Sequence, residues 1–249
     1  MIRGIYTSGL GMTRETKRLD IVSNNLANAS TTGFKSDGAV CGTFKKALND
    51  VMVSGSRIDV ANYTPDIVNT YTKFTQGSLR STGNSTDLAI SNDDNAFFTV
   101  EDKNGNQLYT RDGAFIIDKD NYLVTSEGYK VLDTNGEYIN INDNEFGISV
   151  SGQISSNNGE IIGNLLISSF DNPETLNKIG DNMLEASPNS VSREFDGEIQ
   201  QGYLEMSNVN TVSEMVNMIA ISRAYEANQK VLQSQDEMLG KAVSDVGRV

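Results

Sequence analysis

Residues 19–35 read LDIVSNNLANASTTGFK, and this stretch decides how the chain starts to fold. Its first half places Leu19, Val22 and Leu26 at intervals of three and four residues, which is the spacing of one apolar face on an α-helix. Its second half runs through serine and threonine to Gly33, a residue that readily takes the left-handed conformation found after many helices. The stretch therefore predicts a helix that stops shortly before Gly33.

The same apolar spacing extends back toward the start of the chain. Val22 widens a stripe that recurs every seven residues and consists of Ile5, Met12, Leu19 and Leu26. A narrow stripe with this repeat is typical of a coiled-coil seam. The opposite face carries polar residues such as Arg14 and Lys17. Residues 2–29 are therefore expected to form an amphipathic helix.

A second long helix is predicted from Thr211 to about Val243. Thr211 and Glu214 have the spacing of a capping box, which would make the threonine the N-cap. Apolar residues again recur every seven positions, at Met218, Tyr225, Leu232 and Leu239. Two interpretations stay open. The two seams could form a coiled coil with each other or between subunits, or the helices could form an ordinary hairpin packed on the central domain.

The middle of the chain has the pattern of short β-strands. From about residue 88 to 198, brief apolar runs alternate with turn signals such as Asn104 followed by Gly105. Residues 97–100 and 108–110 are predicted to pair across that turn. A second hairpin is expected at 114–117 and 122–125, and residues 161–170 give the strongest apolar strand.

These patterns predict an α+β protein whose terminal helices pair around an inserted all-β domain of meandering hairpins. The expected divisions are an N-terminal helix in residues 1–36, a connector in 37–80, a β domain in 81–204 and a C-terminal helix in 205–249. Within the connector, residues 43–53 have some helical character and residues 65–75 are expected to be extended.

Composition argues against several classes of function. The chain has no His and one Cys, Cys41, so an internal disulfide, the usual zinc sites and a His-activated nucleophile are excluded. A net charge of -13 disfavours binding to nucleic acid. No apolar run reaches the ~18 residues that a membrane span requires. We expect no cofactor and no membrane insertion.

Carboxylates are plentiful, but no pair of them stands out as catalytic. Asp93 and Asp94, Asp118 and Asp120, and Asp143 and Glu145 fall near turn signals, where Asp is favoured for backbone reasons and Asn would serve as well. Asp118 and Asp120 begin like a calcium loop, but the glycine and glutamate that should follow are missing. We therefore predict no catalytic, cofactor or metal site.

Three ordered motifs resemble those of the flagellar basal-body rod family, which includes rod and hook proteins. The N-terminal signature is the stretch quoted first, and its matching residues are Asn24, Asn25, Leu26, Ala27, Asn28, Gly33, Phe34 and Lys35. Residues 204–238 resemble the C-terminal signature of the family. Residues 109–115 and 122–129 resemble its β domain. One departure is the turn at 92–96, where family members commonly have a Gly-x-Gly sequence.

The resemblance implies a structural subunit of the bacterial flagellar rod. Its terminal helices would polymerise into the inner layer of a hollow helical drive shaft, with the β domain outside. Expected partners are further copies of the chain, other rod and hook proteins and the flagellar type III export apparatus. The chain lacks the apolar region of a secretory signal, so we expect export to the basal body without cleavage.

Residues at the helix seams are the predicted self-assembly contacts, namely Ile5, Met12, Leu19, Val22, Leu26, Met218, Tyr225, Leu232 and Leu239. Two alternatives remain. A hook-type subunit would usually be longer, with additional outer domains. A secreted β-domain enzyme or glycan-binding protein is disfavoured because the chain has no His and no convergent group of reactive residues.

Overall fold

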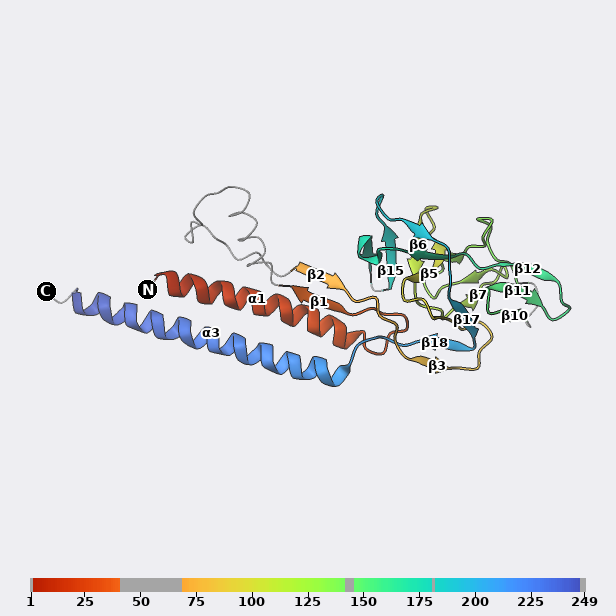
Figure 1. The fold of residues 1–249 in the computed structure, drawn as a ribbon. Coiled ribbons are helices and arrows are strands. Elements are labelled where there is room, and N and C mark those ends of the chain that lie inside the picture. Colours follow the sequence, from red (N-terminus) through yellow and green to blue (C-terminus); the bar gives the residue numbers. More distant parts are fainter. Residues whose placement is uncertain (1, 41–68, 142–145, 181, 247–249) are drawn as a thin grey trace. The chain divides into compact units, whose positions relative to one another are not determined.

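The computed structural model describes residues 2–40, 69–141, 146–180 and 182–246 (Figure 1). Contacts divide the chain into two compact units. The helical unit comprises Met1–Ala27, Asp37–Tyr71 and Asn210–Val249, and the β unit comprises Asn28–Ser36 and Thr72–Val209. The predictions for Cys41, for a helix at 43–53 and for Asp143 and Glu145 lie outside the described residues.

Two long helices dominate the helical unit. Helices α1 (Ile2–Ala27) and α3 (Thr211–Val246) run side by side in opposite directions (Figure 1). Strands β1 (Asp37–Val40) and β2 (Asn69–Thr72) pair with each other. Paired terminal helices around an inserted region of antiparallel strands confirm the predicted α+β fold class.

The start of α3 differs from the prediction by one residue. Asn210 is the N-cap, because its Oδ1 accepts the backbone N–H of Ser213 at 3.0 Å and its carbonyl accepts that of Glu214. Thr211 is instead the first helical residue, so the capping box was wrong. Asparagine ranks among the best N-cap residues. From one position before the predicted N-cap, the side chain of Asn210 accepts the Ser213 N–H in the first turn of the helix.

The β unit is built around a nine-stranded antiparallel sheet. The main path runs through β14 (Leu176–Ile179), β15 (Met183–Ala186), β6 (Gln107–Thr110), β5 (Ala96–Glu101), β9 (Lys130–Val131), β8 (Leu123–Val124) and β7 (Ile116–Ile117). Strand β13 (Ile167–Phe170) joins the sheet by pairing with β5 and with β16 (Ser192–Arg193).

Smaller sheets complete the β unit. Their strands are β10 (Phe146–Ile148), β11 (Gln153–Ser156) and β12 (Ile161–Asn164) in one sheet, β17 (Glu198–Gln201) with β4 (Leu88–Ser91) in another, and β18 (Tyr203–Glu205) with β3 (Leu79–Ser81) in a third. A short 3-10 helix, η1, spans Pro173–Thr175. The strand pairs in these three sheets are all antiparallel.

Both predicted hairpins form. Strands β5 and β6 pair across Asn104 and Gly105, and Gly105 takes a φ of +85° that few other residues tolerate. Strands β7 and β8 form the second hairpin, shorter than predicted.

The predicted strand at 161–170 is wrong as a single element. It breaks into β12 and β13, which belong to different sheets. At the break, the backbone N–H of Leu165 bonds to Gly152 and that of Leu166 bonds to Leu132. The Asp133 carboxylate also accepts the N–H of Asn164 at 2.7 Å. Long-range hydrogen bonds at residues 164–166 therefore divide a stretch that the sequence pattern had indicated as one strand.

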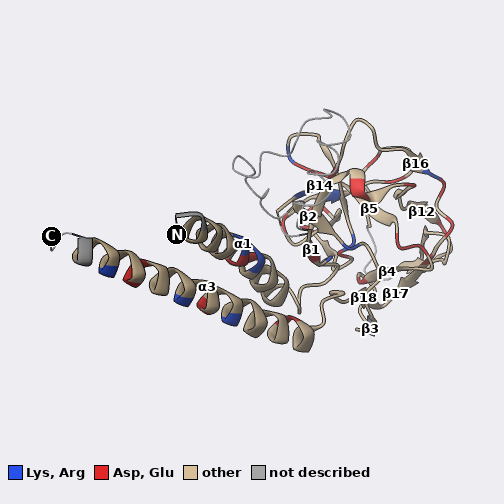
Figure 2. Cartoon of the chain, turned by 60° about the vertical axis from the view of Figure 1, so that its left-hand side comes forward, with Lys and Arg blue, Asp and Glu red and all other residues tan. Residues whose placement is uncertain are grey.

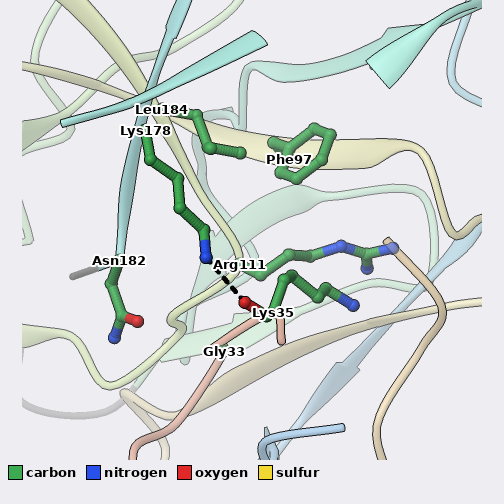
Figure 3. Close-up of a pocket in the computed structure, with 7 residues that line it drawn as sticks. All are labelled: Gly33, Lys35, Phe97, Arg111, Lys178, Asn182 and Leu184. Atoms are coloured by element: carbon green, nitrogen blue, oxygen red, sulfur yellow. Dashed lines mark hydrogen bonds between the residues drawn. The ribbon is translucent and has the colours of Figure 1, made fainter. Parts of the chain in front are cut away.

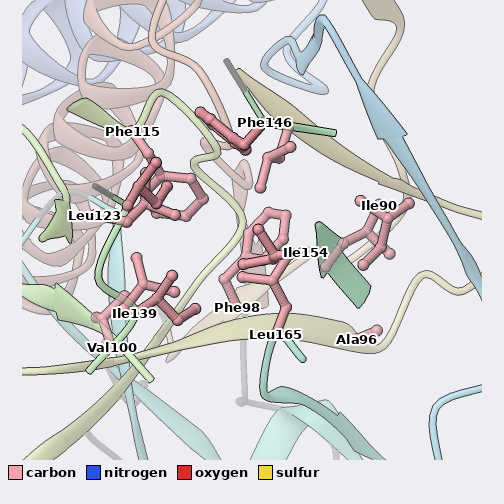
Figure 4. Close-up of a cluster of buried hydrophobic side chains, with 14 of the residues drawn as sticks. Ile90, Ala96, Phe98, Val100, Phe115, Leu123, Ile139, Phe146, Ile154 and Leu165 are labelled. Carbon is pink, nitrogen blue, oxygen red and sulfur yellow. The ribbon is translucent and has the colours of Figure 1, made fainter. Parts of the chain in front are cut away.

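The apolar core of the β unit lies between these sheets (Figure 4). Phe98, Val100, Leu123 and Ile154 are fully buried there, and the rings of Phe98 and Phe115 pack edge to face with centroids 5.2 Å apart. Burying each large side chain contributes about 1.5–3 kcal/mol. The β unit therefore has a core of its own, independent of the helices.

Candidate functional site

The predicted self-assembly residues lie along the line where α1 and α3 meet, at different depths. Val22 is buried, and Tyr225 is 37% exposed. The remaining positions are half-buried, namely Ile5, Met12, Leu19, Leu26, Met218, Leu232 and Leu239. The apolar stripes therefore flank the seam more than they fill it.

The deepest line of α1 is largely polar. Ser8, Glu15 and Val22 are spaced by seven residues and are 7%, 1% and 8% exposed, and Asn25 is 2% exposed. On α3, Ile221 is buried, at 3% exposed. Sequence reasoning missed Ser8 and Glu15 because polar residues were assigned to the solvent face. The signal available was position, since both lie three residues after an apolar stripe residue.

Glu15 is balanced by two arginines of its own helix. Its Oε1 lies 2.7 Å from Arg14 and its Oε2 lies 2.9 Å from Arg18. Both arginine side chains are partly exposed, at 49% and 40%, so solvent weakens these pairs. The two pairs nevertheless supply partners for a carboxylate that would otherwise be costly to bury.

The first turns of α3 carry a second apolar surface, directed away from the seam. Val212, Met215, Val216 and Ile219 are 70%, 53%, 61% and 56% exposed. Their spacing of three and four residues places them on one face of the helix, opposite the buried Ile221. Further along α3, Lys and Arg alternate with Asp and Glu (Figure 2). We call Val212, Met215, Val216 and Ile219 the outer apolar face; contiguous apolar surface of this kind marks interaction sites.

Lys35 of the N-terminal motif is held in a buried ionic cluster inside the β unit. Its Nζ lies 2.7 Å from Oε1 of Glu205 and donates to the carbonyl of Thr75 at 2.9 Å. Arg111 approaches the other carboxylate oxygen at 3.4 Å, and all three ionic side chains are at most 4% exposed. Burial lowers the pKa of Lys35 and that of Arg111, and the negative charge of Glu205 opposes both shifts.

Glu205 precedes α3 in the chain, and Lys35 follows α1. The Gly33 N–H also donates to the carbonyl of Glu205 at 2.8 Å, and Asn208 accepts the Ser36 N–H through its side chain at 2.8 Å. These contacts fasten the segment after α1 to the segment before α3. The cluster therefore holds together the two segments from which the chain leaves the β unit, after Ser36 and after Val209.

The structure gives a physical reason for two residue types in the N-terminal motif, Gly33 and Phe34. Gly33 has a φ of +68°, and a Cβ there would collide with the backbone of Arg111 and Asp112. Phe34 is 2% exposed, and the ammonium group of Lys178 lies 4.6 Å from its ring centroid. Only glycine fits the first position, and the second is a core residue.

The asparagines and the alanine of the N-terminal motif differ in how deeply they are buried. Asn25 exchanges two hydrogen bonds with the backbone of Asp37, at 2.8 and 2.9 Å. Asn24 and Ala27 are exposed, and Asn28 is half-buried. Asn25 therefore fixes the chain after the helix, whereas Asn24 and Ala27 face outward.

Asp112 is bonded to the same turn. Its Oδ1 accepts the hydroxyl of Thr32 at 2.7 Å and the N–H of Ala114 at 3.1 Å. Burial raises the pKa of Asp112, and these hydrogen bonds counteract part of that rise.

A small cavity adjoins the ionic cluster (Figure 3). Its volume is about 10 Å³, which is space for roughly one water molecule. Lys178 points toward it and donates to the carbonyl of Lys35 at 2.7 Å. The cavity is lined by Gly33, Lys35, Phe97, Arg111, Lys178, Asn182 and Leu184. It is too small for an organic substrate.

Of the carboxylates considered from sequence, those that the structure describes do not converge. Asp118 and Asp120 are exposed, whereas Asp93 is buried and paired with Arg193 at 2.8 Å. Among the residues that the structure describes, no group of three or more acidic, His or Cys side chains is placed to hold a metal ion. In the same residues, neither helix is long and apolar enough to cross a membrane.

Comparison with known proteins assigns the chain to a family. Residues 5–35 match the family model for flagella basal body rod proteins, residues 89–162 that of the flagellar hook protein FlgE/F/G D1 domain, and residues 200–245 that of the flagellar basal body rod FlgEFG protein C-terminal region. The flagellar basal-body rod protein FlgG of Borreliella burgdorferi is 38% identical, over 97% of this chain and 98% of the relative. The chain belongs to the flagellar basal-body rod protein family.

Other relatives in this family agree over nearly the whole length. FlgG of Agrobacterium fabrum is 33% identical over 95% of this chain and 97% of its own length. The rod protein FlgF of Caulobacter vibrioides is 34% identical over 96% of this chain and 97% of its own. These matches confirm the predicted resemblance to the family.

Proposed function

We propose that this chain is a structural subunit of the bacterial flagellar basal-body rod, polymerising through its terminal helices into a hollow helical drive shaft. Relatives named FlgG, at 33–38% identity over nearly their full length, support the rod assignment. The proposal places the chain in the basal body, together with other rod and hook proteins. It includes passage through the flagellar type III export apparatus, which the family resemblance suggests.

The outer apolar face of α3 is the observation that carries the mechanism. Four large apolar side chains, each more than half exposed, occupy about two turns of a helix whose opposite face is already engaged with α1. Burying each of them contributes about 1.5–3 kcal/mol. Further copies of the chain are the partners that we propose for this face. Repeated head-to-tail contacts that do not close produce a filament.

The predicted seam residues take a different role in this proposal. Half-buried residues such as Leu26 and Leu232 hold α1 against α3 within one subunit, and their exposed edges contribute to contacts between subunits.

The two alternative functions, a hook-type subunit and a secreted β-domain protein, have less support. The chain matches rod proteins from end to end, which disfavours a longer hook-type subunit. In the part of the chain that the structure describes, no group of residues supports a glycan-binding or catalytic function, and we propose that the chain is not an enzyme.

Ile219→Asp tests this assignment of the outer apolar face. Because Ile219 is 56% exposed in the single subunit, aspartate there leaves the hairpin intact. Between subunits it would bury an unpaired carboxylate, which costs several kcal/mol at every contact. We expect a monomer with unchanged circular dichroism, no filaments in electron micrographs of concentrated protein, and no motility when the variant replaces the natural chain.

Gln229→Asp is the matched control. It adds the same charge to an exposed polar position of the same helix, and we expect filaments and swimming to persist. Normal assembly of Ile219→Asp would exclude the outer apolar face as a subunit contact. The family assignment would survive that result, whereas failure to find the chain in purified basal bodies would overturn the rod function itself.

A further inference from the structure

Two glycines of α1 lie opposite two amide side chains of α3. A Cβ placed on Gly11 would stand 3.1 Å from Nδ2 and 3.3 Å from Oδ1 of Asn228. A Cβ placed on Gly4 would stand 2.5 Å from Oε1 of Gln235. Each amide therefore lies so close to where the first carbon of a side chain on α1 would stand that it would have to move to admit one. Gly9, between them in sequence, has no atom within 4 Å of its Cβ position.

The apolar stripes alone do not determine how α1 and α3 align. Both repeat every seven residues, so sliding one helix by seven residues brings apolar positions opposite apolar positions again. Such a slip moves the helix by about 10 Å along its axis. Leu232, for example, would exchange one stripe residue of α1 for the next. A feature that is not equivalent at each repeat has to select the register.

The glycine–amide pairs supply that feature, because they occupy only two successive repeats: the two glycines are seven residues apart on α1, the two amides are seven residues apart on α3, and the next repeats carry Arg18 and Ile221. A slip in one direction would bring Gln235 opposite Gly11 but Asn228 opposite Arg18, so that only one of the two amides would still face a glycine. A slip in the other direction would bring Ile221 opposite Gly11 and leave Gln235 without a glycine. The observed register places both amides opposite glycine.

The energetics of Gln235 point to selectivity more than to stability. Its Oε1 is buried and has no hydrogen-bond partner. An unsatisfied buried polar atom destabilises a fold, and an apolar side chain in this position would avoid that cost. Polar residues inside coiled coils are known to specify register at the expense of stability.

We infer that the Gly4–Gln235 and Gly11–Asn228 pairs set the register of α1 against α3. The inference concerns a single chain and does not depend on polymerisation. It also fixes which part of α1 lies behind the outer apolar face of α3.

Leucine substitutions in the full chain test the contact at Gly11. Gly11→Leu should lower the temperature at which helical circular dichroism is lost by several degrees. The control Gly9→Leu enters open space and should leave that temperature unchanged or raise it. Adding Asn228→Ala should recover most of the loss in Gly11→Leu, because the smaller side chain vacates the space. Equal melting of the two leucine variants, or no rescue, would overturn the inference.

Cross-linking tests the register itself. In a Cys41→Ser background, Gly4→Cys with Gln235→Cys should form an intramolecular disulfide on oxidation. Adding Gly11→Leu should reduce its yield several-fold, whereas adding Gly9→Leu should not, and Asn228→Ala should restore it. An undiminished yield in Gly11→Leu, or a chain without cooperative loss of helix on heating, would show that these pairs do not set the register.

Discussion

Asp93 lies near a turn signal in the sequence, but its side chain is buried and hydrogen-bonded. Its carboxylate accepts hydrogen bonds from Ser169 at 2.8 Å, from Arg193 at 2.8 Å and from the Asn95 N–H at 3.0 Å, and it is 3% exposed. Treating it as a turn residue that asparagine could replace is therefore wrong. The partners come from positions about 75 and 100 residues away in sequence, which no local pattern encodes.

Asp93→Asn should destabilise the β unit by about 1–3 kcal/mol, because the amide nitrogen cannot accept the bonds that one carboxylate oxygen now accepts. Urea denaturation followed by tyrosine fluorescence measures the loss. Asp120→Asn, in an exposed turn, is the control and should stay within about 0.5 kcal/mol of the natural chain. Equal stability of the two variants would contradict the structural role of Asp93.

Asp112 gives a prediction for pH dependence. Burial raises its pKa above 3.8, so the folded chain holds this proton at pH values where the unfolded chain has released it. Stability from this group is therefore present at acid pH and is lost as pH rises through that window. Asp112→Asn keeps an acceptor oxygen for Thr32 but cannot titrate. The stability of the variant relative to the natural chain should increase as pH rises from about 4 to 7, and a constant difference would contradict the shift.

The N-terminus of α3 offers a test at the scale of an element. Asn210→Ala removes the side-chain acceptor of the Ser213 N–H and should cost about 1 kcal/mol of helix stability. Thr211→Ala should cost little, because Thr211 is the first helical residue and alanine favours helices. Urea denaturation monitored by circular dichroism compares the two. A larger loss for Thr211→Ala would restore the capping box that the sequence suggested.

Elements differ in how far sequence predicts them, for physical reasons. Both helices and the two hairpins were predicted because their signals are local, such as the seven-residue repeat and the turn at Gly105. The break at Leu165 was not, since it depends on hydrogen bonds to Gly152 and Leu132. At the candidate site, the apolar seam residues were recognised, but buried Ser8 and Glu15 were not. Their burial depends on which face of α1 meets α3, which the repeat leaves undetermined.

The whole molecule combines two compact units. The β unit has a complete apolar core, and the helical unit has a seam whose apolar residues are mostly half-buried. A substitution in the seam should therefore affect the helices while the β unit stays folded. Variants can therefore be examined for damage to the pairing of α1 with α3 separately from damage to the contacts between subunits.

Leu26→Asp and Leu232→Asp should each abolish filament assembly and motility, with a loss of helical circular dichroism that Ile219→Asp does not show. Both leucines are half-buried in the single subunit, so aspartate there weakens the hairpin before any contact between subunits forms. Lys17→Glu, on the exposed face of α1, is the control and should assemble. Limited proteolysis should still leave the β unit intact in all these variants. Normal swimming by the leucine variants would contradict a role of the seam in assembly, and loss of the protease-resistant β unit would contradict the independence of the two units.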